Sequence, residues 1–254
     1  MSKPQTRTAP KRDGVTRAAW YGFGPNRLHL CGPDANREVF AYLEAGSTDP
    51  GLQYLMQGFK TLYPYLQEIA RANGIADPFD DRVVEAYWVG NALLETIPQQ
   101  RFYRHLRDTL DLKRKYKTRE FDQLVEKLGK GARMHHNVHV LNAYKRTGHD
   151  AKLHTLESMD SCRVSWGKVT AVEGASVTVQ RQPLAQHEKK LLLGPAVSVT
   201  LRRRLEEDGS LDDLAVGDIV TMHWGVICEI IPAASVPWLK KYTDLAIGLS
   251  NPTL

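Results

Sequence analysis

The chain has 254 residues, of which 42% are hydrophobic and 25% are charged, the composition of a globular protein with one large domain or two ordinary ones. No apolar run approaches the about 18 residues that a membrane-spanning helix needs, and the first residues lack the apolar segment of a secretory signal. The cysteines, Cys31, Cys162 and Cys228, are odd in number and far apart, which argues against a disulfide framework. We therefore expect a cytoplasmic protein that does not contact a membrane.

The net charge of +5 is concentrated at the start of the chain. The first 17 residues contain five basic side chains and one acidic one, so that 5 − 1 = +4 lies there. This stretch also contains Pro4 and Pro10 and no apolar run, so residues 1–19 are predicted to form a disordered basic tail. The rest of the chain is close to neutral, which gives little support for nucleic acid as a partner.

Residues 20–155 are predicted to form an all-helical domain, because their apolar side chains recur at three- and four-residue steps. After a loop over residues 20–25, a short helix is predicted over 36–45. A long amphipathic helix follows over 50–74, with a kink at Pro64. Further helices are predicted over residues 80–96, around 102–110 and around 121–128.

Near residue 160 the apolar spacing changes to the alternation that is typical of strands. The apolar set shifts by one position at Gly167, as it does at a β-bulge or a tight bend. Residues 220–230 alternate without a break and are predicted to form one long strand, and residues 238–249 a closing helix. The expected fold class is therefore α+β: an N-terminal all-helical domain, then a small OB-like β-barrel with a C-terminal helix over residues 156–254.

Two segments of this second domain carry a recognisable motif. The first reads Cys162-Arg163-Val164-Ser165-Trp166-Gly167-Lys168-Val169, and the second reads Val216-Gly217-Asp218-Ile219-Val220-Thr221-Met222-His223-Trp224-Gly225-Val226. Together they resemble the HypC/HupF family of chaperones that act in the maturation of nickel–iron hydrogenase, over about residues 160–235. Two positions depart from the family pattern. The cysteine lies inside the chain instead of following an initiator methionine, and Trp166 stands where the family has proline.

The resemblance implies a fold and a function. The fold is the small OB-like barrel, and the function is that of a scaffold or carrier for an iron centre with cyanide and carbonyl ligands. It implies that Cys162 and His223 contact the iron, with Gly167, Lys168, Gly217 and Asp218 as the framework of the site. The implied partner is the hydrogenase large-subunit precursor or another maturation protein. A thiolate is a soft ligand that suits iron of this kind.

A second group of candidate ligands lies before the predicted domain boundary, where His135, His136 and His139 follow Met134. His135 and His139 are spaced to share one face of a helix, which is a pattern for a metal pair. If this group faces the barrel, it shares one site with the motif cysteine and histidine. Cys31, in a loop rich in glycine and proline, is a further candidate as an exposed thiol, whereas Cys228 is predicted to fill the core.

Three functions follow from these observations. The first is the hydrogenase accessory protein, which carries out no reaction of its own. The second is a metal-dependent enzyme with a histidine site in the helical domain, acting in the synthesis of a metal ligand. The third, which we rank last, is a module that binds RNA or an acidic partner through the basic tail and the barrel.

Overall fold

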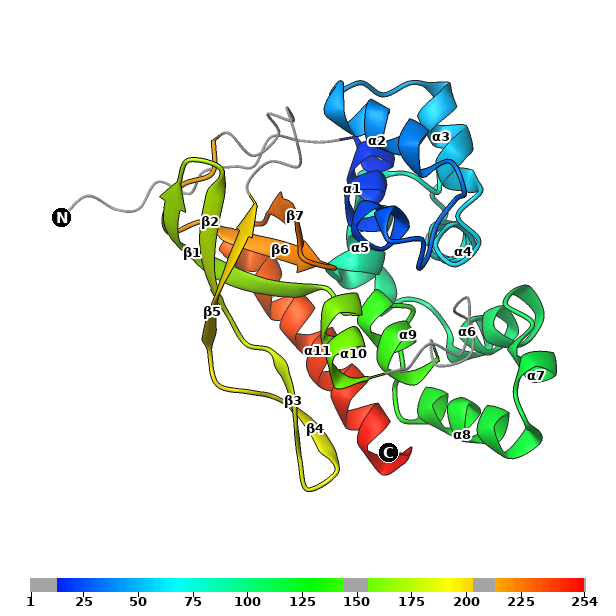
Figure 1. The fold of residues 1–254 in the computed structure, drawn as a ribbon. Helices are drawn as coiled ribbons and strands as arrows, with labels where there is room; N and C mark the ends of the chain where they lie inside the picture. Colours follow the sequence, from blue (N-terminus) through cyan, green and yellow to red (C-terminus); the bar gives the residue numbers. More distant parts are fainter. Residues whose placement is uncertain (1–12, 144–154, 203–212, 254) are drawn as a thin grey trace.

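The computed structural model describes residues 13–143, 155–202 and 213–253, and it confirms the α+β class (Figure 1). Most of the predicted basic tail, residues 1–12, lies outside the described residues. Helices fill the first part of the chain, strands follow, and one long helix closes the fold. None of the described helices is both long and apolar enough to cross a membrane. The helices are α1 (Gly14–Arg27), α2 (Asn36–Glu44), α3 (Pro50–Gln57), α4 (Tyr63–Ala72), α5 (Asp81–Trp88), η1 (Ala92–Leu94), α6 (Gln99–Arg104), the π-helical turn η2 (His105–Thr109), α7 (Leu112–Lys115), α8 (Thr118–Gly129), α9 (His136–Asn142), α10 (Leu156–Cys162), η4 (Ala233–Ser235), α11 (Val236–Ser250) and η5 (Asn251–Thr253).

Helix α1 corrects the prediction of a tail followed by an aromatic loop. It begins at Gly14, where the side chain of Asp13 accepts a hydrogen bond from the Thr16 amide. Residues 17–26 are all buried, and the helix packs against α2, α5 and the end of the sheet (Figure 1). The density of glycine suggested a turn, but here glycine allows close packing. A Cβ atom at Gly24 would lie 2.5 Å from the carbonyl oxygen of His223.

Two other helix predictions need correction, whereas the predictions for α2 and α8 are confirmed. The predicted helix over residues 50–74 is in fact two helices, α3 and α4. Pro64 lies in the first turn of α4, where proline starts a helix because its missing N–H has no partner to lose. The predicted helix over residues 80–96 ends at Trp88, and Gly90 follows with a φ of 98°.

The strands are β1 (Ser165–Glu173), β2 (Ser176–Arg181), β3 (Leu184–His187), β4 (Lys190–Leu193), β5 (Val197–Arg202), β6 (Ile219–His223) and β7 (Val226–Ile230). Five of them form an antiparallel sheet in the order β5-β2-β1-β6-β7, and β3 and β4 form a separate hairpin. Closure of the sheet into a barrel stays a prediction. The predicted closing helix is confirmed as α11.

The strand predicted over residues 220–230 is a hairpin. Trp224 and Gly225 form its two-residue turn with φ values of 50° and 72°, so that His223 and Val226 lie opposite each other. The turn reverses the side on which even-numbered residues lie: Met222 faces the small core of the sheet, whereas Val226 packs in the large core. Because both faces of the hairpin are buried, the alternation gives no sign of the turn.

The large hydrophobic core crosses the boundary that was predicted at residue 155. It includes residues of α1, α5 and α9, continues through Cys162 and Val164, and ends in α11, which packs along α9 (Figure 1). The small core lies within the sheet, around Val169, Val179 and Val220. The helical part and the sheet are therefore joined by shared packing, and buried side chains lie where they meet.

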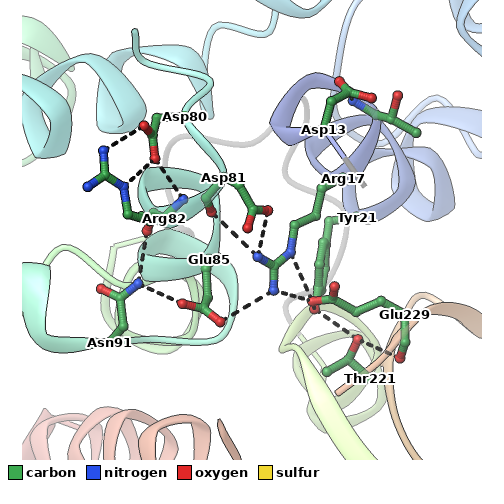
Figure 2. Close-up of polar contacts among 11 residues, drawn as sticks. Asp13, Arg17, Tyr21, Asp80, Asp81, Arg82, Glu85, Asn91, Thr221 and Glu229 are labelled. Atoms are coloured by element: carbon green, nitrogen blue, oxygen red, sulfur yellow. Dashed lines mark hydrogen bonds and ion pairs between the residues drawn. The ribbon is translucent and has the colours of Figure 1, made fainter. Parts of the chain in front are cut away.

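A buried ion-pair cluster joins α1, α5 and β7 (Figure 2). Arg17, which was assigned to the disordered tail, is 7% exposed and pairs with Glu229 at 2.8 Å and with Asp81 at 2.9 Å. Burial by itself lowers the pKa of Arg17, but Glu229 and Asp81 beside it raise that pKa above its ordinary value. The hydroxyl of Tyr21 completes the cluster by donating to Glu229 at 2.6 Å and by pairing with Thr221 at 2.9 Å.

Candidate metal centre

Three buried side chains with metal-ligating atoms meet between the helices and the sheet. They are His136 at the start of α9, Cys162 at the end of α10 and His223 at the end of β6, and their ligand atoms all lie within 4.8 Å of one another. The site therefore combines the two motif residues with one histidine of the His135–His139 group. Cys162 was expected in a strand, but it is the last residue of a helix.

His223 is held in one tautomer. Its Nδ1 lies 2.6 Å from the carbonyl oxygen of Tyr21, which can only accept, so Nδ1 carries the proton and Nε2 carries the lone pair. That Nε2 is buried and makes no hydrogen bond of normal geometry to any described residue, although the backbone of Cys162 lies close enough to the ring to oppose the effect of burial on its pKa. Burial lowers the pKa of His223 to about 4, so the ring is neutral at pH 7. An imidazole whose other nitrogen donates to a carbonyl is the usual form of a histidine that binds a metal.

His136 is fixed in a similar way. Its Nε2 lies 2.8 Å from the carbonyl oxygen of Cys162, so Nε2 donates and the lone pair is on Nδ1, 3.3 Å from the hydroxyl of Tyr87. Burial, with the neighbouring His223, lowers the pKa of His136 well below its ordinary value. Both imidazoles therefore stay neutral at pH 7. The lone pair of His223 has no partner among the described residues, whereas that of His136 faces the hydroxyl of Tyr87 and must leave it to bind a cation.

The thiol of Cys162 is 5% exposed. Burial, and then the nearby Cys31, raises the pKa of Cys162 to about 12, so without a cation the group is a neutral thiol at pH 7. A metal ion binds the thiolate, which means that binding at this site releases a proton.

These side chains surround a small cavity of about 20 Å³. That volume is close to the space that one water molecule needs, so a single metal ion fits and an iron atom that carries cyanide and carbonyl ligands does not. Apolar and aromatic side chains make up most of the remaining wall. The lining residues are Pro25, Cys31, Phe59, Thr61, Leu62, Tyr87, Trp88, His136, His139, Cys162 and His223.

Two residues that sequence reasoning did not select position the ligands. Asn137 is fully buried, and its side chain bonds both the N–H and the carbonyl of Val164, at 2.8 and 2.9 Å, which fixes the end of α10 against α9. Trp88 stacks on Tyr21 at 5.0 Å and lies 4.4 Å from the ring of His136. Asn137 lies among histidines near a helix start, so the sequence gives no distinct signal for it. Trp88 has no signal beyond its apolar spacing.

The proposed pair of His135 and His139 is not formed. His135 precedes α9 and caps it, since its Nδ1 accepts from the amide of Asn137 at 3.0 Å, and its ring stacks on Tyr242. His139 lines the cavity, but its Nδ1 pairs with the hydroxyl of Tyr65 at 2.9 Å. Because His135 is the N-cap, its side chain does not lie on the helical face of His139, and His136 alone joins the cluster.

The four framework residues lie in β1 and in the turn before β6, outside the cluster. A Cβ atom at Gly167 would lie 2.5 Å from Cγ1 of Val179, so glycine lets β1 and β2 approach; Lys168 next to it is exposed. Gly217 has a φ of 102° and donates to the carbonyl of Val169, and the carboxylate of Asp218 accepts from the Ala215 amide at 2.8 Å. Their contacts position β6, which ends at His223.

The two remaining cysteines differ in their surroundings. Cys31 is partly buried as a residue and lines the cavity next to the cluster, and burial raises the pKa of its thiol, so this thiol is not the exposed group that was predicted. Cys228 is 1% exposed and packs in the large core, as predicted.

The chain belongs to a family of unknown function (DUF6390), whose model matches residues 10–254. Comparison with curated proteins and with solved structures gave no match. The family model spans both the helical part and the sheet, and the resemblance to the hydrogenase chaperones stays a prediction.

Proposed function

We propose that the protein holds one transition-metal ion in the cytoplasm through His136, Cys162 and His223. The observation that carries this proposal is the buried Nε2 of His223, which has no hydrogen-bond partner among the described residues and lies beside a thiol and a second neutral imidazole. A buried acceptor without a partner costs about 1–3 kcal/mol of stability, and a bound cation would remove that cost.

The ligand types indicate which ions bind. Imidazole nitrogen and thiolate sulfur suit borderline and soft ions such as Fe(II), Zn(II) and copper, whereas Mg²⁺ and Ca²⁺ prefer oxygen. The chain holds both histidines neutral before the ion arrives, so only the thiol must lose a proton. The apolar wall excludes water, which slows the release of the ion.

The experiment is metal analysis of protein purified without oxygen, in the wild type and in two variants that keep the shape of the site. Cys162→Ser removes the soft ligand, and His223→Asn removes the Nε2 lone pair while keeping a donor for the Tyr21 carbonyl. We expect about one ion per chain in the wild type, and at least a tenfold weaker affinity in each variant. His187→Asn is the matched control, because His187 is exposed on β3 and lies outside the cluster. Folded wild-type protein that binds no added Fe(II), Zn(II) or copper would refute the proposal.

A second candidate function is the iron carrier of hydrogenase maturation. The observation that favours it is that Cys162 and His223, the two residues marked by the resemblance, lie within 4.8 Å of each other although 61 positions separate them. The cargo would be iron with its cyanide and carbonyl ligands, and the partner the hydrogenase large-subunit precursor or another maturation protein. Since the cavity holds a single ion, this function requires the site to open when the cargo binds.

Infrared spectroscopy tests this second function. Protein purified without oxygen from cells that express hydrogenase maturation genes should show cyanide and carbonyl bands that disappear in Cys162→Ala, together with hydrogenase activity. Protein that carries an ion but shows no such bands, in cells with normal hydrogenase, would support simple metal binding and reject the carrier.

A further inference from the structure

The segment between α1 and α2 brings a second thiol to the wall of the candidate metal centre. Cys31 lines the same cavity as His136, Cys162 and His223, and its Sγ lies 3.0 Å from Oγ1 of Thr61. The three clustered ligands are buried, whereas Cys31 is partly exposed. The cavity therefore has one wall near solvent, and that wall carries a potential ligand.

The backbone around this cysteine is held in place. The side-chain amide of Asn26 donates to the carbonyls of Cys31 and Pro33, at 3.3 and 2.7 Å. Gly32 has a φ of 113°, and a Cβ atom there would lie 2.5 Å from Nδ2 of Asn26, so the segment needs glycine to follow this path. The position of the thiol beside the cavity is therefore fixed by specific contacts of its neighbours.

We propose that Cys31 is the fourth ligand of the metal ion, so that the occupied centre is a Cys₂His₂ site. This inference rests on the proposed function and adds the ligand that sets the class of ion. The Sγ of Cys31 is not one of the atoms that lie within 4.8 Å of one another. It reaches the ion when the side chain exchanges its hydrogen bond with Thr61 for a bond to the metal, losing its proton to solvent.

The fourth thiolate has two consequences. Two thiolates and two imidazoles form the tetrahedral set that is typical of zinc and of iron bound to sulfur, and they favour these ions over those that need an open coordination position. With all four positions filled by the protein, the centre holds its ion without a bound water and carries out no hydrolysis. Because Cys31 is the ligand nearest to solvent, we expect it to leave first when the ion is transferred.

Cobalt substitution tests the inference, because Co²⁺ follows zinc in coordination and each bound thiolate adds intensity to its near-ultraviolet charge-transfer band. The wild type should show the band of two thiolates with visible bands of a tetrahedral ion. Cys31→Ser and Cys162→Ser should each lose about half of the charge-transfer intensity per bound ion. Cys228→Ser is the matched control, since Cys228 lies in the core away from the cavity, and it should keep full intensity.

The outcomes separate the two proposals. Full charge-transfer intensity per ion in Cys31→Ser would overturn the role of Cys31 and leave the three-ligand site intact. Absence of any thiolate band in the wild type would overturn the metal site itself. A measurement on the unchanged protein covers the case in which Cys31→Ser does not fold: saturation with Co²⁺ or Zn²⁺ should slow alkylation of Cys31 by iodoacetamide at least tenfold, and an unchanged rate would reject the inference.

Discussion

Two buried polar clusters join α1 to the sheet, and they differ in how completely their groups are paired. In the first, the Arg17 cluster, the guanidinium contacts Glu229 and Asp81, and the hydroxyl of Tyr21 bonds both Glu229 and Thr221 (Figure 2). In the second, the candidate metal centre, the groups are neutral, and the Nε2 of His223 makes no hydrogen bond to a described residue. Tyr21 belongs to both, through its hydroxyl in one and its carbonyl in the other.

The contrast is between buried polar groups that satisfy one another and a buried acceptor that no described residue satisfies. Charges in the Arg17 cluster are matched and hydrogen-bonded, which is what burial of charge requires. At the candidate metal centre, backbone carbonyls fix the tautomers of His136 and His223. The Nε2 lone pair of His223 lies near the thiol of Cys162. Only the second cluster leaves a buried acceptor without a partner among the described residues, and a bound cation is one group that would satisfy it.

The largest expected effect is the loss of the Arg17 cluster. Arg17→Met keeps the side-chain volume but leaves the largely buried Glu229, whose side chain is 12% exposed, without its cation. Breaking a fully buried ion pair costs about 3–5 kcal/mol of unfolding free energy, so we expect about 3 kcal/mol here. Urea unfolding of the wild type and of Arg17→Met measures this loss of unfolding free energy. The control is Arg82→Met, which breaks the exposed pair with Asp80 and should cost about 0–1 kcal/mol. Equal losses in the two variants would mean that the buried cluster contributes no more than a surface pair.

The second-largest effect is the stabilisation by a bound metal ion, which should depend on the candidate metal centre and not on the Arg17 cluster. At a free-ion concentration about 100 times the dissociation constant, the ion should raise the unfolding free energy of the wild type by about 2.7 kcal/mol, and chelation should remove that gain. Arg17→Met should gain as much as the wild type, provided that it is folded, because its lesion lies outside the metal centre. Cys162→Ser with His223→Asn should gain almost nothing. A gain in that double variant equal to that of the wild type would place the ion elsewhere.

The sequence identified the fold class, most of the helices, and two of the three clustered ligands. Cys162 and His223 were found because they lie in motifs, and His136 was included only as one of three neighbouring histidines. Local spacing does not distinguish among those three. Which of them joins the ligand cluster depends on where α9 begins, and His135 caps that start.

The incorrect predictions from the sequence have a common physical cause. Arg17 was assigned to a tail because its charge was counted among nearby charges, whereas its partners lie 64 and 212 positions away. The glycines of α1 were taken for a turn because glycine marks both turns and close packing. The hairpin of β6 and β7 was missed because both of its faces are buried. In each case the deciding contact is long-range, and sequence periodicity reports only local order.

The smallest effect tests whether an unpartnered histidine is enough to make a binding site. His105 is also buried, and its Nε2 also makes no hydrogen bond within the described part of the chain, but the three-residue ligand cluster does not include it. Burial, with smaller effects of His139 and Arg71, lowers the pKa of His105 to about 3. The unfolded chain therefore binds a proton between pH 6.5 and 3 that the folded protein does not, and stability is lost as the pH falls through this range.

Between pH 6.5 and 5 the contribution of this one residue to the unfolding free energy changes by about 1.6 kcal/mol. We expect His105→Gln to reduce the pH dependence of the unfolding free energy by that amount, and a saturating metal ion to leave the reduction unchanged. Urea unfolding at the two pH values, with the ion and with chelator, measures both quantities. If the ion abolished the contribution of His105, this histidine would belong to the metal centre. If only the ligand cluster responds to the ion, an unpaired nitrogen becomes a binding site only where the fold places a thiol and a second imidazole beside it.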